Sequence, residues 1–308
     1  MHKKNNRPTP KGRKNRQSVF TVVKDDELLP FLLASLKDKT RNKVKAMLTH
    51  KQIKVGKEVI SQHNHPLKKD DKVTVSWDGP FKKESYEGVK IVFEDDDVIV
   101  INKRSGLLSI GSAKEKRQTA YRIVTNHIQT DNPVARLFVV HRLDREASGL
   151  MVFAKNKVAQ THLVESWKNT LSKNMYLAVV QGTIDEDEKT ITSYLKESKA
   201  LIVHSGNNPK EGKKAVTRYK VVKKNEYYTL LEAWQDTERK NQLRVHLKSI
   251  GHPIIGDKKY GAKESPIKRT ALHLRKLFFI HPGNGKEMNF ETKVPEDFLK
   301  LFRYRYYE

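Results

Sequence analysis

The amino-acid sequence predicts an α+β protein whose larger part has a mixed or antiparallel central sheet with flanking helices. Residues 213–222 alternate between apolar and polar side chains, as a strand does, and residues 228–234 form a second strand-like segment. Short apolar runs at 137–140 and 150–154 are typical of buried strands. Residues 40–50, by contrast, carry apolar side chains at helical spacing. A smaller α+β unit is therefore expected ahead of the sheet-based one.

The charge balance points to a polyanionic partner. The 308 residues include 61 Lys and Arg against 36 Asp and Glu, a formal net charge of +25. Such an excess favours nucleic acid, although a generally basic protein without such a partner is the alternative. The chain has no cysteine, which excludes disulfides and thiolate metal sites and suits the cytoplasm. We expect no signal peptide, and no apolar stretch approaches the ~20 residues of a membrane-spanning helix.

The composition also divides the chain. Residues 1–17 carry seven Lys or Arg and no acid, so a disordered basic arm is expected there. Residues 78–90 combine Gly, Pro and charged side chains, which predicts a linker. We therefore expect a small domain at 18–77 between the arm and the linker, and a large domain at 91–308.

The small domain carries a basic helix face. A helix over residues 40–50 places Val44, Met47 and Leu48 on one side, and its other side is basic. A hairpin is expected to follow, with its turn at Gly56-Lys57. Two short helices with a basic edge and a small sheet resemble the S-four-like RNA-binding domain first known from a ribosomal protein. That resemblance implies RNA contact, whereas a merely solvated face is the alternative. The expected RNA-binding side chains are Arg41, Lys43, Lys45 and Lys54.

Three consecutive acids, Asp95 to Asp97, lie between apolar runs at 91–93 and 98–101. Such a cluster raises the possibility of a metal-dependent nuclease that uses these acids with nearby histidines. Acids in a hairpin turn, however, are more often solvated turn formers. We therefore expect a tight turn here and no metal site.

The stretch from His141 to Lys155 holds the most informative acid. Asp144 stands between the apolar runs that precede and follow it, with Arg142 two residues before it and a turn expected at Ser148-Gly149. If the backbone is extended there, the Asp144 and Arg142 side chains lie on one face. A buried Asp paired to an Arg is common and need not be catalytic. The other reading is a carboxylate nucleophile or general base, and residue types alone leave the two readings even.

Two later segments bear on that choice. Tyr176 begins the strand-like run Leu177 to Val180, where an aromatic ring is most often part of the core. A helix starting at about Gln242 would bury Leu243 and Leu247. Arg244 would then lie on a different face of that helix, where it could meet an acid.

These segments together resemble the motifs of the RluA-type pseudouridine synthases. Residues 141–155 resemble "H-R-L-D-x-x-T-S-G-L-L-x-x-A-K", and residues 176–182 resemble "Y-x-A-x-V-x-G". Residues 242–261 resemble the third motif, and residues 271–282 resemble the closing strand. The matches occur in order over nearly the whole large domain, which makes them far more specific than "H-R-L-D" alone.

The chain departs from those motifs at several positions. Ala147 stands where Thr is usual, Arg104 replaces the Pro of "K-P-x-G", and Asn174 stands where Lys is common. Residues 238–241, Glu-Arg-Lys-Asn, replace "G-R-T-H". We expect these changes to alter substrate contacts, because they leave the three expected catalytic residues in place.

The resemblance implies isomerisation of uridine in RNA to pseudouridine, with no cofactor and no metal. Asp144 would be the catalytic carboxylate, Arg244 would pair with it, and Tyr176 would lie against the uracil ring. The target base would have to leave its stack. The substrate-binding residues expected in this domain are His141, Arg142, Ser148 and Gly149.

The RNA itself is left open by the sequence. The net charge of +25 and the S-four-like domain favour large-subunit ribosomal RNA over transfer RNA. A non-catalytic RNA-binding or ribosome-assembly protein is the alternative class, and the intact catalytic residues argue against it. We expect a monomer that binds RNA and does not bind membranes.

Overall fold

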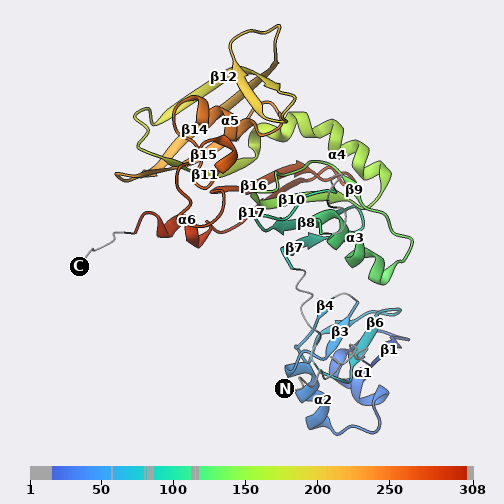
Figure 1. Ribbon diagram of the computed structural model, residues 1–308. Helices are drawn as coiled ribbons and strands as arrows, with labels where there is room; N and C mark the ends of the chain where they lie inside the picture. Colours follow the sequence, from blue (N-terminus) through green and yellow to red (C-terminus); the bar gives the residue numbers. More distant parts are fainter. Residues whose placement is uncertain are drawn as a thin grey trace, which may run out of the picture. The chain divides into compact units, whose positions relative to one another are not determined.

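The computed structural model describes residues 16–56, 58–79, 81, 87–111, 115 and 118–303 (Figure 1). The chain forms two compact units, which meet in sequence within residues 82–86. Most of the predicted basic arm lies outside the described residues, as do Lys57 of the expected hairpin turn and the middle of the expected linker.

In its described residues, the first unit has two helices and two small sheets. Its strands are β1 (Gln17–Thr21), β2 (Asp26–Glu27), β3 (Ile53–Val55), β4 (Glu58–Val59), β5 (Pro66–Leu67) and β6 (Lys72–Ser76), and its helices are α1 (Leu28–Ser35) and α2 (Arg41–Thr49). Four strands pair in the order β1-β6-β3-β4, and β2 pairs with β5. Strand β1 already begins at Gln17, so the last residue of the predicted arm belongs to this sheet.

Helix α2 forms as predicted, because its sequence supplies both a cap and an apolar face. The Thr40 hydroxyl accepts a hydrogen bond from the Lys43 amide at 3.4 Å, which satisfies one of the free donors of the first turn. Val44, Met47 and Leu48 are buried against α1 and the sheet. The basic side chains of this helix are therefore left on its exposed faces.

The second unit is larger. Its strands are β7 (Val89–Glu94), β8 (Val98–Lys103), β9 (Phe138–Val139), β10 (Ser148–Ala154), β11 (Met175–Gln181), β12 (Glu188–Glu197), β13 (Val203–Gly206), β14 (Lys213–Lys224), β15 (Tyr228–Gln235), β16 (Leu272–Ile280) and β17 (Glu287–Glu291). Its helices are α3 (Ala120–Asp131), α4 (Lys157–Thr170), α5 (Gln242–Ser249) and α6 (Glu296–Lys300), with 3₁₀ turns η1 (Leu171–Lys173) and η2 (Lys258–Tyr260).

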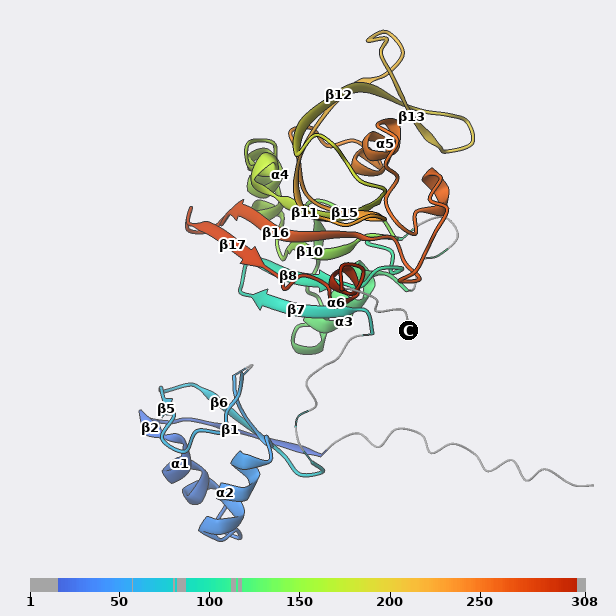
Figure 2. The same cartoon turned by 90° about the vertical axis from the view of Figure 1, so that its left-hand side faces the viewer.

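One mixed sheet organises this unit (Figure 2). The strand order is β13-β12-β14-β15-β11-β16-β10-β8-β7, with β17 paired to β16 and β9 paired to β10. The β10–β16 pair is parallel, and its antiparallel neighbours make the sheet mixed. Helix α4 packs on β10 and β16, and α5 packs beside β12, β13 and β14. The predicted α+β class, with a mixed central sheet and flanking helices, is confirmed.

The centre of this sheet is buried on both faces. All seven residues of β10 are buried, as are the first four of β8, which explains their nearly unbroken apolar sequences. Helix α4 starts where the Asn156 side chain accepts a hydrogen bond from the Ala159 amide at 2.8 Å. From there it buries Leu163 and Trp167 at helical spacing against the sheet. A rigid core therefore lies beneath the loop between β9 and β10.

The turn predicted at Ser148-Gly149 is wrong, because both residues belong to β10. Gly149 pairs with Leu274 of β16 at a backbone φ of 121°. A Cβ atom at Gly149 would lie 2.4 Å from the Leu274 carbonyl oxygen. The glycine is therefore required by close packing with a strand more than 120 residues later in the chain.

No helix of the described residues is long and apolar enough to cross a membrane. Asp95 to Asp97 form the turn between β7 and β8, as predicted. The Asp95 carboxylate accepts hydrogen bonds from the Asp97 and Val98 amides at 2.9 and 2.8 Å. Within the described ranges, His, Asp and Glu side chains form no group of three or more that could hold a metal ion.

Candidate active site

The Asp144 side chain belongs to an irregular loop between β9 and β10 and lines a small cavity. Its side chain is 28% exposed. The Arg244 Nη1 atom, from the first turn of α5, lies 3.2 Å from Asp144 Oδ2. This is the contact that the sequence predicted between residues 100 positions apart.

Arg244 is itself held by a second acid, to which the sequence analysis gave no role. Its Nε and Nη2 atoms donate to Asp257 Oδ2 and Oδ1 at 2.6 and 2.7 Å. Both side chains are almost fully buried, at 3% and 1% exposed. The Arg244 Nη1 atom also donates to Glu146 Oε2 at 3.1 Å and to Asn241 Oδ1 at 3.3 Å. A bidentate buried pair therefore fixes the plane of the guanidinium group that faces Asp144.

A buried lysine supports the loop from below. Lys103, the last residue of β8, is 0% exposed. Its Nζ atom donates to the carbonyl oxygens of Ala147 at 2.6 Å and Leu107 at 2.7 Å, with longer contacts to those of Arg104 and Arg145. Burial lowers the pKa of Lys103 to about 7. Its contacts with Ala147 and Arg145 fix the backbone on the C-terminal side of Asp144.

The electrostatics of Asp144 reflect two opposing influences. Burial raises the pKa of Asp144 above its ordinary value, and the nearby charges of Glu146 and Asp257 act in the same direction. The charge and hydrogen bond of Arg244 lower the pKa of this carboxyl group and limit the rise. Arg244 therefore favours the ionised form of an acid that burial alone would tend to protonate.

Tyr176 and Arg142 line the same cavity as Asp144. Burial raises the pKa of the Tyr176 hydroxyl, and the charges of Glu238 and Asp144 reinforce that rise, so the phenol is neutral at pH 7. The cavity measures about 50 Å³, well below the roughly 300 Å³ at which ligand pockets usually begin. The Arg142 side chain is exposed and lies at the edge of this cavity between the protein and solvent.

His141 and Ser148, which the sequence placed at the RNA, lie inside the protein. The His141 ring is 5% exposed, accepts a hydrogen bond from the Val152 amide at 3.1 Å and stacks on Trp167. Burial lowers its pKa to about 3, so the ring is neutral. Ser148 is 6% exposed and contacts His273 and Arg269. Both side chains are therefore held by partners within the second unit, and their expected contact with substrate stays a prediction.

The segment that departs from the family motif also reaches this cavity. Glu238 lines it and accepts a hydrogen bond from Trp167 Nε1 at 3.1 Å. Asn241 has a left-handed backbone with φ of 56°, which Asn tolerates, and its side chain contacts Arg244 and Tyr260. Within residues 238–241, Glu238 and Asn241 therefore place polar side chains at the cavity, and Asn241 accepts a hydrogen bond from Arg244.

The predicted basic side chains of the first unit have different surroundings. Arg41, Lys43 and Lys45 are exposed on α2. Lys54 is half-buried on β3, and its Nζ atom lies 4.8 Å from the centre of the Phe81 ring. This part of the expected site is thus a basic surface of the first unit.

Three residues contribute to the site without having been predicted from the sequence: Asp257, Glu146 and Lys103. Asp257 was visible in the "G-D" of the third motif, and Glu146 lies two residues after Asp144. A helix-face argument predicts that Arg244 meets an acid but does not say which one. Lys103 follows an apolar strand and looks like any solvated terminal lysine in the sequence.

Comparisons with known proteins agree with this geometry. Residues 97–249 match the family described as RNA pseudouridylate synthase. The chain is 32% identical over 290 residues to "Uncharacterized RNA pseudouridine synthase YlyB" of Bacillus subtilis, covering 90% of this chain and 93% of that protein. It is 35% identical over 227 residues to "Ribosomal large subunit pseudouridine synthase D" of Neisseria meningitidis, covering 68% of this chain and 59% of that protein.

A solved structure shows the same fold. "Human RNA Pseudouridylate Synthase Domain Containing 1" aligns with a TM-score of 0.57 at 23% identity, covering 70% of this chain and 87% of that chain. The sequence match to the YlyB protein extends over almost the full length of both chains. The chain therefore belongs to the RNA pseudouridylate synthase family.

Proposed function

We propose that this enzyme converts uridines of large-subunit ribosomal RNA to pseudouridine, with Asp144 as the catalytic carboxylate. The observation that carries the catalytic assignment is the pairing of Asp144 with Arg244 at 3.2 Å, in a cavity that Tyr176 also lines. The ribosomal target is supported by the relative from Neisseria meningitidis that is named as a large-subunit synthase.

The reaction requires a flipped uridine, since its carbon 5 and its glycosidic bond must both reach the acid. A cavity of about 50 Å³ is much smaller than the pockets that usually hold ligands. RNA binding must therefore widen it, and we assign that movement to the exposed Arg142 side chain. Displacement of Arg142 would also leave its guanidinium available for the gap in the RNA stack or for a phosphate.

Asp144 would act as an ionised carboxylate on the sugar or the base, so that the bond between carbon 1′ and nitrogen 1 breaks and carbon 5 takes its place. Arg244 would hold that carboxylate ionised and correctly oriented. Tyr176 would lie against the ring with a neutral hydroxyl, because its raised pKa excludes a phenolate at pH 7. That hydroxyl would orient carbon 5 for loss of its proton, and the proton that nitrogen 1 gains after the glycosidic bond breaks balances the one that carbon 5 loses. The isomerisation transfers neither electrons nor phosphate, and it uses protein groups alone.

The first unit would hold the substrate by charge. Arg41, Lys43 and Lys45 are exposed on one short helix, as in the S-four-like domain that the sequence resembles. Contacts from such side chains to phosphates are independent of sequence and weaken with added salt. We therefore assign affinity to this unit and uridine selection to the cavity at Asp144.

The direct test of the substrate is release of tritium from RNA labelled at carbon 5 of uridine. The full chain is incubated separately with large-subunit ribosomal RNA and with transfer RNA from cells that lack the protein. Release from ribosomal RNA alone supports the proposal. Release from transfer RNA alone would contradict the ribosomal target but support the pseudouridine synthase activity. Release from neither RNA would contradict the proposed activity itself.

A further inference from the structure

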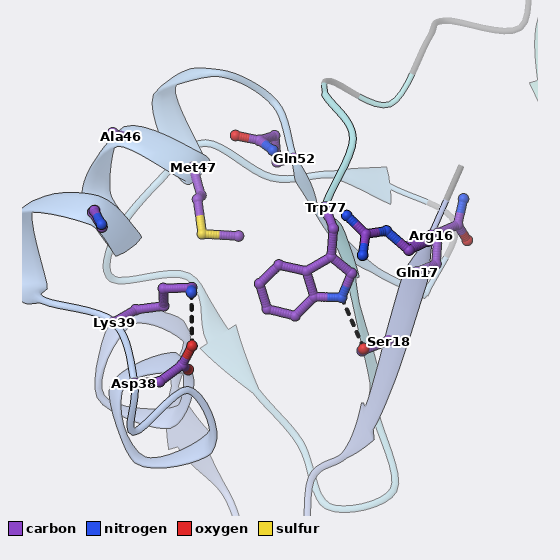
Figure 3. Close-up of a pocket in the computed structure, with 10 residues that line it drawn as sticks. Arg16, Gln17, Ser18, Asp38, Lys39, Ala46, Met47, Gln52 and Trp77 are labelled. Atoms are coloured by element: carbon purple, nitrogen blue, oxygen red, sulfur yellow. Dashed lines mark hydrogen bonds and ion pairs between the residues drawn. The ribbon is translucent and has the colours of Figure 1, made fainter. Parts of the chain in front are cut away.

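The first unit contains a cavity with an aromatic wall, distant in sequence from Asp144. It measures about 910 Å³ and lies between α2 and β1, with Trp77, the residue that follows β6, in its lining. This volume falls within the range of roughly 300 to 1,000 Å³ typical of ligand pockets. Figure 3 shows the Met47 side chain pointing from α2 toward the indole ring of Trp77, with Lys39 nearby. The cavity therefore has an apolar surface on two sides.

The Trp77 ring is held in a fixed orientation. Its Nε1 atom donates to Ser18 Oγ at 2.9 Å, and its backbone amide donates to the Arg16 carbonyl at 3.0 Å. The ring is only half-buried, so part of its surface faces the cavity. An indole that is anchored at its polar edge and open on its face can stack against a planar ligand without losing much entropy on binding.

Cations border the aromatic wall. Lys39, Lys43 and Arg16 line the cavity, whereas Asp38 is the one acid among the described residues of its lining. Asp38 pairs with Lys39 at 2.6 Å. The Lys39 Nζ atom lies 5.8 Å from the centre of the Trp77 ring. An aromatic face flanked by cations is the combination that proteins use to bind unpaired nucleotides, by stacking the base and neutralising its phosphates.

We propose that this cavity binds one unpaired nucleotide of the substrate RNA. The base enters between Trp77 and Met47, and its flanking phosphates contact Lys39, Lys43 and Arg16. This site is separate from the cavity at Asp144 and depends on the proposed function only in that RNA is the substrate. It also changes the part played by the first unit, which selects an unpaired stretch of RNA in addition to attracting phosphates.

The faces of α2 provide a matched pair of variants. Lys43 lies one turn before Ala46 and Met47, and all three line the cavity. Lys45 is exposed on the same helix but does not line it. Removing either lysine removes one positive charge from the same helix. Both variants lose the same charge, so the general effect of charge on RNA affinity is equal in the two. A difference in affinity between the Lys43→Ala and Lys45→Ala variants therefore measures the contribution of the cavity.

The experiment measures binding of the full chain to a fluorescent single-stranded RNA and to a duplex of equal length. Trp77→Ala should weaken single-strand binding by about tenfold, the usual cost of losing one stacked base, and should leave duplex binding within about twofold. Lys43→Ala should weaken single-strand binding more than Lys45→Ala does. Unchanged single-strand affinity of Trp77→Ala, or an equal loss for duplex RNA, would overturn the proposal.

Trp77 also packs against the core of the first unit, so the Trp77→Ala variant could lose affinity by unfolding that unit. A second variant with a smaller change controls for this. Trp77→Phe keeps an aromatic face and loses only the bond to Ser18. It should bind single-stranded RNA within about threefold of the wild type and lose part of the tryptophan quenching that RNA causes. Quenching equal to that of the wild type would mean that no base stacks on Trp77, and the site would be refuted.

Two further controls separate the explanations. An acidic peptide whose binding depended on Trp77 as strongly as RNA binding does would make the cavity a protein-docking surface and would overturn the nucleotide assignment. The binding assay needs no turnover. If the wild-type chain formed no pseudouridine, the proposed function would fail while the dependence of RNA binding on Trp77 could still be measured.

Discussion

Two of the three guanidinium nitrogens of Arg244 donate hydrogen bonds to Asp257, and the third donates to Asp144. The two bonds to Asp257 measure 2.6 and 2.7 Å, and the contact from Nη1 to Asp144 measures 3.2 Å. Asp257 therefore fixes the angle at which the guanidinium meets Asp144, although it does not line the cavity with them. This makes Asp257 the positioning residue of the site, acting through Arg244.

Replacing Asp257 with Asn should lower both stability and turnover. Arg244 is 3% exposed, so loss of its main partner leaves a buried charge poorly compensated, at a cost of about 3–5 kcal/mol in the free energy of unfolding. Urea denaturation measures that change. Asp297→Asn is the matched control, because it breaks a similar two-bond pair with Arg269 that is partly exposed, and it should cost about 1 kcal/mol or less. Equal costs for the two variants would contradict this account.

The pH dependence of turnover should respond to Glu146. The folded-state pKa of Asp144 is raised, so the ionised carboxylate is lost as pH falls through that raised value. The negative charge of Glu146 contributes to the rise. Glu146→Gln should therefore move the acid limb of the kcat/KM profile to lower pH. Profiles of the two proteins between pH 4 and pH 8 test this, and a limb that stays in place or moves upward would show that Asp144 is not the group that titrates.

Removing the hydroxyl of Tyr176 should affect catalysis and spare binding. The neutral phenol is proposed to order the loss of the carbon-5 proton, so Tyr176→Phe should reduce turnover by about 100-fold or more. The ring remains, and RNA affinity should stay within about threefold. Tyr121→Phe removes a hydroxyl bonded to the Leu137 carbonyl, away from the cavity lining, and serves as the comparison. Similar turnover in the two variants would reduce Tyr176 to a packing residue.

Gly149 should prove to be a structural requirement. Gly149→Ala places a Cβ atom 2.4 Å from the Leu274 carbonyl at a φ of 121°, and the combined clash and strain should cost about 3 kcal/mol or more. Gly106→Ala has a φ of 87° and open space around its Cβ, so only strain of about 1–2 kcal/mol is expected. Thermal unfolding compares them. If both variants unfold at the same temperature, close packing with β16 does not explain the glycine.

Local pattern predicted the elements well. The spacing of Val44, Met47 and Leu48 gave helix α2, and the helix beginning at Gln242 placed Arg244 where it meets Asp144. Both predictions rest on the spacing of apolar residues within a single segment, and that spacing can be read from the sequence without knowing the tertiary structure. The helix face indicated only that Arg244 meets an acid; that this acid is Asp144 was implied by the resemblance to the RluA-type synthases, and the two side chains do lie in contact.

The features that the sequence did not predict depend on contacts between segments that are far apart in the sequence and meet only in the folded chain. Ser148-Gly149 looked like a turn, because a glycine after a serine usually marks one, yet the partner that demands it is Leu274 of β16. His141 looked available to RNA, yet Trp167 from α4 covers its ring. Nothing in the sequence singled out Lys103, yet four carbonyl oxygens surround its ammonium group. In each case the deciding neighbour lies outside the local sequence pattern.

The central claim is that the Asp144 carboxylate performs the chemistry. Asp144→Asn keeps the size of the side chain and removes its charge. Tritium release from uridine-labelled ribosomal RNA should fall by about 10⁴-fold or more, while a filter-binding assay shows RNA affinity within about threefold of the wild type. Release at the wild-type rate from this variant would contradict the assignment of Asp144.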